Sequence, residues 1–286
     1  MGPAFRLLPL AVLLFGGAWP VTKAALTHAT PMWFAVGRAG LAAVVAAALL
    51  AVLRRLHLPR AADWPSVLAL GLLQLGGFFA LAHAAVALVP AGRTAIISAV
   101  TTYWLIPLSI LVLGEKVSAL RWVAAAFGLA GVVVLAGPWS VDWTRADMVL
   151  GHLMLIGAAG LWSVAIVVTR ALPPKSPMLE LLPWCFGFGY LFLLPIAMFL
   201  EPDGGIQGPS WPIMLYIGLI VAPIGTWCVI EIGRRLPGAV ASVAFLLVPA
   251  FGVLVSLLWL GEAIGLDMIL GGGLIVASVA LAARSS

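Results

Sequence analysis

The sequence predicts an all-α polytopic membrane protein, with ten transmembrane helices arranged as two inverted repeats of five. Three observations lead to this prediction: the composition, a series of apolar segments and a duplicated motif. The chain is 64% hydrophobic and only 9% charged, whereas a soluble domain is about a quarter charged. Such a composition cannot cover a surface that faces water, so we expect the chain to lie in a lipid bilayer.

The duplicated motif gives the internal organisation. Residues 90–115 (PAGRTAIISAVTTYWLIPLSILVLGE) and 237–262 (PGAVASVAFLLVPAFGVLVSLLWLGE) both open with Pro and a small residue and close on Leu-Gly-Glu. The second copy follows the first by 147 residues, about half the chain, and a repeat of this size indicates a duplication. We therefore predict a first repeat over residues 1–136, a linker over 137–146 and a second repeat over 147–286.

A helix that crosses a bilayer needs about 20 predominantly apolar residues. The first such run has the character of a signal peptide, but it has a counterpart at the start of the second half, so we expect it to be retained. The connections are short, and none could hold a soluble domain. The predicted helices cover about residues 5–26, 31–53, 64–89, 91–113, 117–136, 147–171, 178–200, 211–233, 238–260 and 263–283.

Lys and Arg residues are distributed unequally between the two sides of these helices. Eleven of the 15 lie on the side of both termini, and the other four are Lys23, Arg38, Arg93 and Arg145. Cytoplasmic loops carry the excess of basic residues, so we expect both termini in the cytoplasm. Because five is odd, the second repeat then enters the membrane from the opposite side, which is the inverted topology of many secondary transporters.

Other classes of function find little support. The net charge of +5 does not indicate a nucleic-acid partner, because the basic residues are sorted by loop, as membrane topology requires. Cys185 and Cys228 lie in apolar segments and are expected to be buried apolar residues. We expect no metal, no cofactor and no enzymatic activity, since the histidines are scattered and have no acidic partner for catalysis: His28, His57, His83 and His152.

Several motifs together resemble a known family. Phe15-Gly-Gly-Ala-Trp19 in the first helix has a weaker echo in Ala158-Ala-Gly-Leu-Trp162 of the sixth, Arg38 lies early in the second, and residues 87–95 read ALVPAGRTA. With the two Leu-Gly-Glu turns, the chain resembles the drug/metabolite transporter superfamily in its ten-helix EamA-type branch. The resemblance covers nearly the whole chain and implies a multi-pass protein of a bacterial-type cytoplasmic membrane. That superfamily moves amino acids, sugars, nucleotide-linked solutes and cationic drugs, and the Trp- and Phe-rich interior is most similar to that of aromatic amino acid exporters.

A site for a small amphipathic solute should be an apolar, aromatic-lined cavity with few polar groups. Trp19 and Trp162 are repeat mates and lie too deep for an interfacial aromatic belt, so we place them across a shared central volume, with helix packing as the alternative. Tyr103 and Trp104 lie at the middle of the fourth helix, and they are not expected both to face inward. Pro249 lies at the equivalent depth of the ninth helix.

Polar residues inside the membrane are further candidates for the site. His83 shares a helix face with Phe79, and intramembrane ionisable groups are functional hypotheses by default. A neutral imidazole bonded to a neighbouring carbonyl is an equal alternative. Gln74 lies nearer the midplane. Lys23 and Arg38 lie at the outer ends of the first and second helices. Either could attract a substrate carboxylate, but snorkelling to the interface is the simpler interpretation.

The motif ends supply candidate gating or turn residues: Pro90, Glu115, Pro237 and Glu262. For the two glutamates, capping or hinge roles are favoured over substrate contact. No Asp or Glu lies in the middle of a helix, which favours facilitated or weakly coupled transport. The small residues of the fifth and tenth helices could pack against neighbouring helices or against a second protomer in a homodimer.

The function predicted from these features is export of aromatic and other apolar amino acids by alternating access through a central aromatic-lined cavity. The alternative within the same class is an exporter of planar cationic drugs or other metabolites. More distant alternatives are an intramembrane enzyme and a membrane protein without transport activity.

Overall fold

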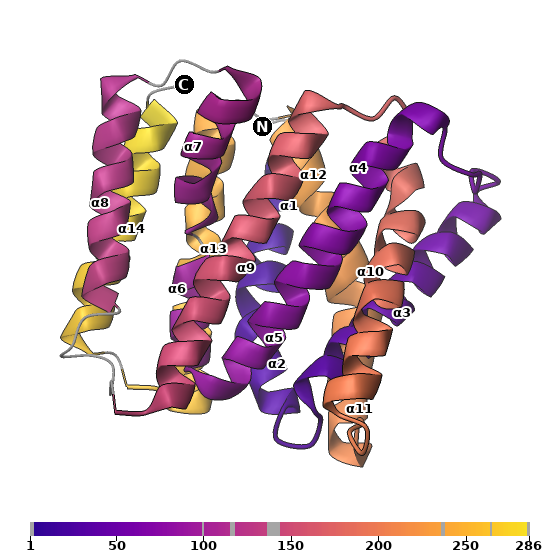
Figure 1. Cartoon of the computed structure of the whole chain (residues 1–286), viewed down its shortest axis with the longest axis horizontal. Coiled ribbons are helices and arrows are strands. Elements are labelled where there is room, and N and C mark those ends of the chain that lie inside the picture. The colour runs from indigo at the N-terminus through magenta and orange to yellow at the C-terminus, as the bar shows by residue number, and fades with distance from the viewer. Residues whose placement is uncertain are drawn as a thin grey trace.

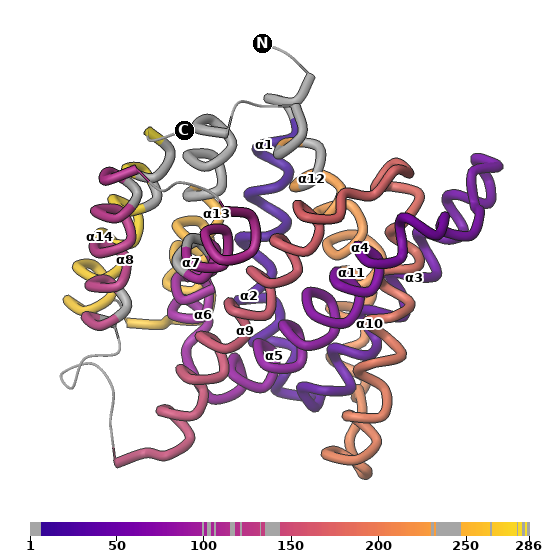
Figure 2. Tube along the Cα trace, turned by 45° about the horizontal axis from the view of Figure 1, so that its top comes forward, coloured from indigo at the N-terminus to yellow at the C-terminus, as the bar shows by residue number. Residues whose placement is uncertain are grey.

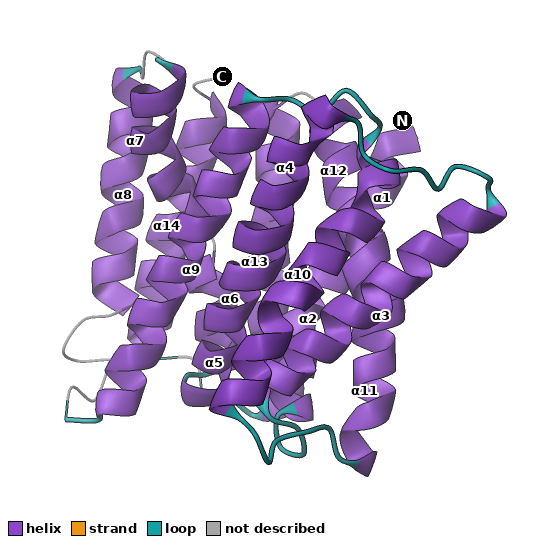
Figure 3. Ribbon diagram, turned by 45° about the vertical axis from the view of Figure 1, so that its right-hand side comes forward, coloured by secondary structure: helices purple, strands orange, loops and turns teal. Residues whose placement is uncertain are grey.

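A computed structural model describes residues 3–98, 100–114, 118–135, 144–235, 238–263 and 265–284. The described residues are almost entirely helical, and one isolated bridge joins Ala29 to Ile206. The α-helices are α1 (Pro3–Ala11), α2 (Gly17–Ala25), α3 (Pro31–Val52), α4 (Trp64–Leu68), α5 (Phe78–Leu88), α6 (Ala91–Ser98), α7 (Thr101–Leu113), α8 (Ala119–Leu135), α9 (Ala146–Ala171), α10 (Met178–Leu200), α11 (Trp211–Tyr216), α12 (Thr226–Arg235), α13 (Gly238–Leu260) and α14 (Leu266–Arg284) (Figures 1 and 3).

The ends of each predicted helix lie within three residues of helix ends in the structure, but the predicted fourth helix corresponds to two helices, α6 and α7. Within the described residues, six helical runs are long and apolar enough to cross a membrane. Shorter apolar helices cover 122–131, 247–260 and 266–278. The protein is therefore an all-α membrane protein, and membrane crossing by the remaining runs stays a prediction. Most of the predicted linker lies outside the described residues.

The first helix of each half runs in the opposite direction to the other. α1 begins, and α14 ends, at one end of the bundle, which we call the termini end (Figures 1 and 2). The run from α1 to α2 leads away from that end, whereas α9 leads toward it (Figure 1). The two halves therefore start from opposite ends of the bundle.

The Leu-Gly-Glu motifs are helix stops. Gly114, which follows α7, and Gly261, which follows α13, have φ values of 65° and 66°. This left-handed conformation is strained for residues with a Cβ atom and is the usual way to end a helix with glycine. Glycine thus serves the same structural purpose in both copies of the motif, which is to end the helix in the left-handed conformation.

The fifth and tenth helices pack against each other within the chain. α8 lies along α14 (Figure 1), and a Cβ atom on Gly131 would lie 2.7 Å from the carbonyl oxygen of Gly271. Ser278 also donates a hydrogen bond to the carbonyl of Ala124. The small residues noted in the sequence therefore serve a close contact between these two helices, and a homodimer stays a prediction.

Three helical runs contain π-helical turns that the sequence pattern did not predict. They lie at Val12–Gly16, Ala69–Gly77 and Ile217–Gly225, and the last two occupy equivalent places in the two halves. Glycines allow close packing here: a Cβ atom on Gly71 would lie 2.7 Å from the Cβ atom of Phe188. π-Helical turns are frequent at functional sites, and these three contribute to the cavities described next.

Candidate functional site

A cavity of about 360 Å³ lies between the two halves, within the about 300–1,000 Å³ typical of small-molecule sites. Helices of the first half contribute Trp19, Arg38 and Phe79, and helices of the second half contribute Trp162 and Pro249. Among the described residues, every residue that lines this central cavity is buried or half-buried. The site is therefore an interior one.

The aromatic residues form a connected wall around this cavity. The Phe78 ring contacts both tryptophans of this wall: its centroid lies 4.7 Å from that of Trp162 and 6.2 Å from that of Trp19. The Phe79 ring lies 4.9 Å from Phe78 and 6.3 Å from Trp162. The two tryptophans predicted to share a central volume thus both line the cavity and both contact the same phenylalanine.

Arg38 supplies a positive charge to this apolar site. Its side chain is only 7% exposed, and its guanidinium carbon lies 3.4 Å from the centre of the Phe79 ring. A desolvated cation–π contact contributes about 2 kcal/mol, while burying an ion costs several kcal/mol. No acidic side chain among the described residues pairs with Arg38, so the protein itself offsets only part of that cost. The expected snorkelling of Arg38 to the interface is therefore wrong.

His83 lies beside the same aromatic wall. Its Nδ1 lies 2.8 Å from the carbonyl oxygen of Phe79, four residues earlier, so Nδ1 carries the proton and donates. Nε2 is buried and has no hydrogen-bond partner among the described residues. The interpretation as an imidazole bonded to a carbonyl is thus correct for one nitrogen, and the other is left as an unpaired acceptor.

A second cavity, of about 700 Å³, adjoins the central one and extends to the termini end. The two cavities share Phe15, Trp162, Ile166 and Val229. The second cavity also reaches exposed residues of the α9–α10 connection, Lys175 among them. Gln74 lines this second cavity and not the first.

At the end opposite the termini, charged side chains hold the turn between α5 and α6. Lys23 donates to the carbonyls of Val86, Ala87 and Val89 at 2.6, 3.1 and 3.1 Å, so its ammonium group contacts the end of α5. The Glu262 carboxylate accepts from the first two backbone N–H groups of α6 at 2.7 and 2.9 Å. Charged groups at helix ends stabilise the unpaired backbone groups there, so this turn is fixed on both sides.

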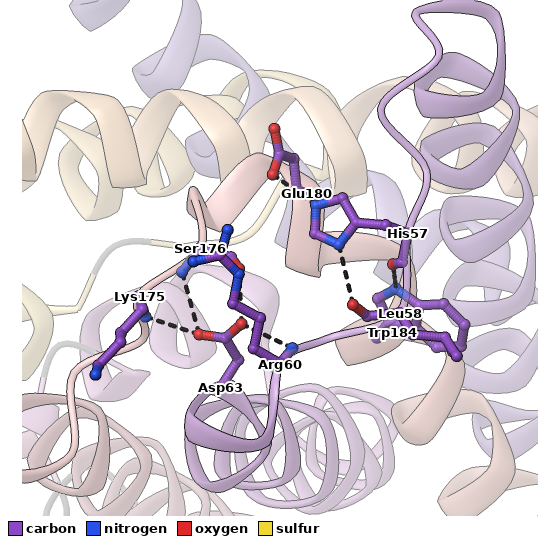
Figure 4. Close-up of polar contacts among 8 residues, drawn as sticks. All are labelled: His57, Leu58, Arg60, Asp63, Lys175, Ser176, Glu180 and Trp184. Atoms are coloured by element: carbon purple, nitrogen blue, oxygen red, sulfur yellow. Dashed lines mark hydrogen bonds and ion pairs between the residues drawn. The ribbon is translucent and has the colours of Figure 1, made fainter.

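A different set of contacts joins the two halves at the termini end (Figure 4). The buried Asp63 carboxylate accepts from the Lys175 N–H at 2.7 Å and from the Ser176 hydroxyl at 2.7 Å. The His57 ring lies 2.8 Å from Glu180, and the Trp184 indole N–H donates to the His57 carbonyl at 3.0 Å. These contacts join the α3–α4 loop to the start of α10, to one side of the second cavity.

The structure brings together only part of the predicted site. Trp104 lines neither cavity: it is 41% exposed, and its indole N–H donates to the carbonyl of Ile156 on α9 at 3.1 Å. Glu262 has the capping role that was favoured for it, and Pro90 precedes the capped helix. The side chain of Tyr103 lies outside what the structure describes, as do Glu115 and Pro237 entirely.

Sequence reasoning missed Phe15, Phe78 and the cavity position of Arg38. A basic residue within an apolar segment was the available signal for Arg38, because such residues commonly face a bundle interior. Ser98 and Thr101, from the fourth predicted helix, also line the central cavity. Within the described part of the chain, no group of three or more His, Cys, Asp or Glu residues could hold a metal ion.

Comparison with known proteins identifies the family. Residues 4–137 and 149–284 each match the EamA-like transporter family, so the chain belongs to that family and carries two such domains. It is 28% identical over 282 residues to an uncharacterized transporter, YvbV, of Bacillus subtilis, covering 96% of this chain and 90% of the relative. It is 26% identical over 282 residues to a probable terminal-alkyne amino-acid exporter of Streptantibioticus cattleyicolor, covering 97% and 92%.

A solved crystal structure has the same fold. The TM-score is 0.69 at 21% sequence identity, and the match covers 98% of this chain and 96% of the other. Together these findings establish a multi-pass transporter with bacterial relatives. The resemblance to aromatic amino acid exporters stays a prediction.

Proposed function

We propose that this chain is a secondary transporter that exports aromatic and other large apolar amino acids by alternating access. The observation that carries the proposal is the central cavity, whose aromatic wall is built from both halves around Trp19, Phe78 and Trp162. One relative is named a probable terminal-alkyne amino-acid exporter, and a terminal alkyne is an apolar group. That name supports the same substrate class.

The two cavities support a transport route. If the termini end faces the cytoplasm, as the distribution of basic residues predicts, the central cavity is reached from the cytoplasm and closed on the other side. Opposed directions of α1–α2 and α9 support an inverted repeat, in which two related halves exchange their conformations around a fixed central site. This would make the present conformation inward-facing.

Export of planar cations is the weaker alternative. A cationic substrate favours a carboxylate in its site, and none of the described lining residues of the central cavity is Asp or Glu. Arg38 would instead repel a cation. The proposal therefore assigns amino acids to this cavity.

The test is uptake of labelled tryptophan, phenylalanine, leucine and alanine into proteoliposomes, with and without an imposed pH gradient. We expect tryptophan and phenylalanine to be taken up and to compete with each other for uptake. Alanine should be neither taken up nor able to compete. Trp19→Ala or Trp162→Ala should weaken uptake about tenfold, because each removes a large apolar contact. Trp211→Ala, at a side chain that is 48% exposed, is the matched control.

Movement of a planar cation without movement of any amino acid would overturn the substrate class. Absence of movement of any solute under every gradient would contradict transport itself.

A further inference from the structure

The Arg38 guanidinium has an unusual environment for a buried ion. Its flat face lies against Phe79, with the central carbon 3.4 Å from the ring centre. The five N–H donors of a guanidinium lie in its plane, so stacking occupies the face and leaves the donating edge unused. Within the described residues no hydrogen bond or ion pair is made by that edge, and Arg38 lines the central cavity.

Three carboxylates toward the end opposite the termini are bonded elsewhere and do not pair with Arg38. Glu201 binds the backbone N–H groups of Met32 and Trp33 at the start of α3, more than a turn away along the helix. Glu262 is engaged with α6, and Asp267 with Arg93 at 2.6 Å. Each of these described carboxylates already has its own partner.

We infer that Arg38 is the binding residue for the carboxylate of the transported solute, which makes the central cavity selective for apolar carboxylates. A guanidinium and a carboxylate form two parallel N–H···O bonds in one plane, and the free edge of Arg38 offers that plane. The inference rests on the proposed function, because it names the group by which the proposed substrates are held.

The rest of the cavity suits the other parts of an amino acid. Trp19, Phe78 and Trp162 offer apolar faces for its side chain. The Ser98 hydroxyl donates to the carbonyl of Ala95 at 2.8 Å, and the Thr101 hydroxyl donates to that of Ser98 at 2.9 Å. Having used its proton, each oxygen can only accept, which suits an ammonium group and not a second carboxylate.

Matched ligands separate the carboxylate from the remainder of the molecule. The probes are L-phenylalanine, 3-phenylpropionate, which lacks the amino group, and phenethylamine, which lacks the carboxylate. Binding to the purified full chain in detergent is measured from the rise of the unfolding temperature with ligand concentration. We expect both carboxylates to bind and phenethylamine to bind at least about 30-fold more weakly, as for loss of one partner of a buried charge pair.

Variants of Arg38 test the same contact from the protein side. Arg38→Gln should lower the affinity for both carboxylates at least about 30-fold and leave that for phenethylamine unchanged or raised. Arg38→Lys keeps the charge but loses the planar fork, so a smaller loss is expected. The control is Arg55→Gln, at an exposed loop arginine. Circular dichroism, and an unfolding temperature without ligand that is near that of the wild type, show that each variant is folded.

The inference would be overturned if phenethylamine bound as tightly as phenylalanine. It would also be overturned if the carboxylates bound equally to the wild type and to Arg38→Gln, or if no carboxylate bound to the wild type. Its failure is distinct from failure of the proposed function. Carboxylates that bind through Arg38 without any phenylalanine uptake into proteoliposomes would contradict only the transport proposal. Uptake that is unchanged in Arg38→Gln would contradict only the carboxylate assignment.

Discussion

The two ends of the central cavity are built differently. At the end opposite the termini, Lys23 and Glu262 bind the backbone on both sides of the α5–α6 turn, directly beside the helices that line the cavity. At the termini end, the Asp63 carboxylate binds Lys175 and Ser176 (Figure 4), and these two residues also line the second cavity, which reaches the exposed surface there. Among the described residues, exposed residues line the two cavities only at the termini end, so we call the opposite end the closed end. It is held by a few charged side chains bound to helix ends.

This difference indicates where the conformational change must act. A transporter that alternates has to break the contacts at its closed end and form equivalent ones at the other. Bonds between a charged side chain and backbone groups are strong enough to close a turn, yet few enough to be broken together. We therefore expect substitutions at the two ends to have different consequences.

The largest effect is expected from removing both charged contacts at the closed end, with Lys23→Met combined with Glu262→Ala. Loss of about 3 kcal/mol of closing free energy would raise the population open to that side about 100-fold. The measurement is the rate at which a membrane-impermeant thiol reagent, added from that side, labels Ser98→Cys in the cavity. Cys185 and Cys228 are buried, and the parent chain gives the background. An unchanged rate would show that these contacts do not close the cavity.

The next effect concerns the stability of the termini end. Asp63→Ala leaves the backbone N–H groups of Lys175 and Ser176 without their acceptor, so the free energy of unfolding should fall by about 2 kcal/mol. Thermal unfolding measures this, with the exposed loop residue substitution Asp203→Ala as control. Labelling of Ser98→Cys from the closed side should not change. A shift in labelling would mean that both ends take part in gating.

A smaller effect should separate charge from hydrogen bonding at Glu262. Glu262→Ala removes the acceptor for two backbone N–H groups and should raise the labelling rate from the closed side about tenfold. Glu262→Gln keeps one neutral acceptor oxygen, so about a threefold increase is expected. Equal effects of the two substitutions would assign the contact to charge alone.

The smallest effect is a dependence on pH at His57, outside the membrane-spanning segments. Hydrogen bonds to the Leu58 carbonyl and to Glu180 raise the pKa of the imidazole above its ordinary 6.5, because both ring nitrogens donate only in the protonated form. A raised folded-state pKa contributes stability below the ordinary pKa, and that stability is lost as pH rises through the raised value. The unfolding temperature of the wild type should therefore be higher than that of His57→Gln at about pH 5.5, and the two unfolding temperatures should be equal at about pH 8.5. A difference independent of pH would contradict this.

The apolar runs determined the helices, because a bilayer sets both the length and the composition of what crosses it. The duplicated Leu-Gly-Glu motifs located two helix ends, since glycine is the residue that adopts the left-handed stop without strain. The tryptophans of the two repeats were predicted to meet, and Trp19 and Trp162 do line one cavity. These features depend on local chemistry and on the duplication, which a single sequence contains.

Only the tertiary structure decided which way the polar and charged side chains point. Lys23 lies near the end of α2, and Arg38 lies about two turns into α3. From such positions a long basic side chain can reach either the interface or a neighbouring helix. The choice depends on whether an unpaired carbonyl or an aromatic face lies within reach, as Val86 and Phe79 do here. Such partners come from helices distant in the sequence, so helical periodicity alone does not place them. The sequence therefore determined the helices and the aromatic character of the site, and the packing of the helices decided where its charge lies.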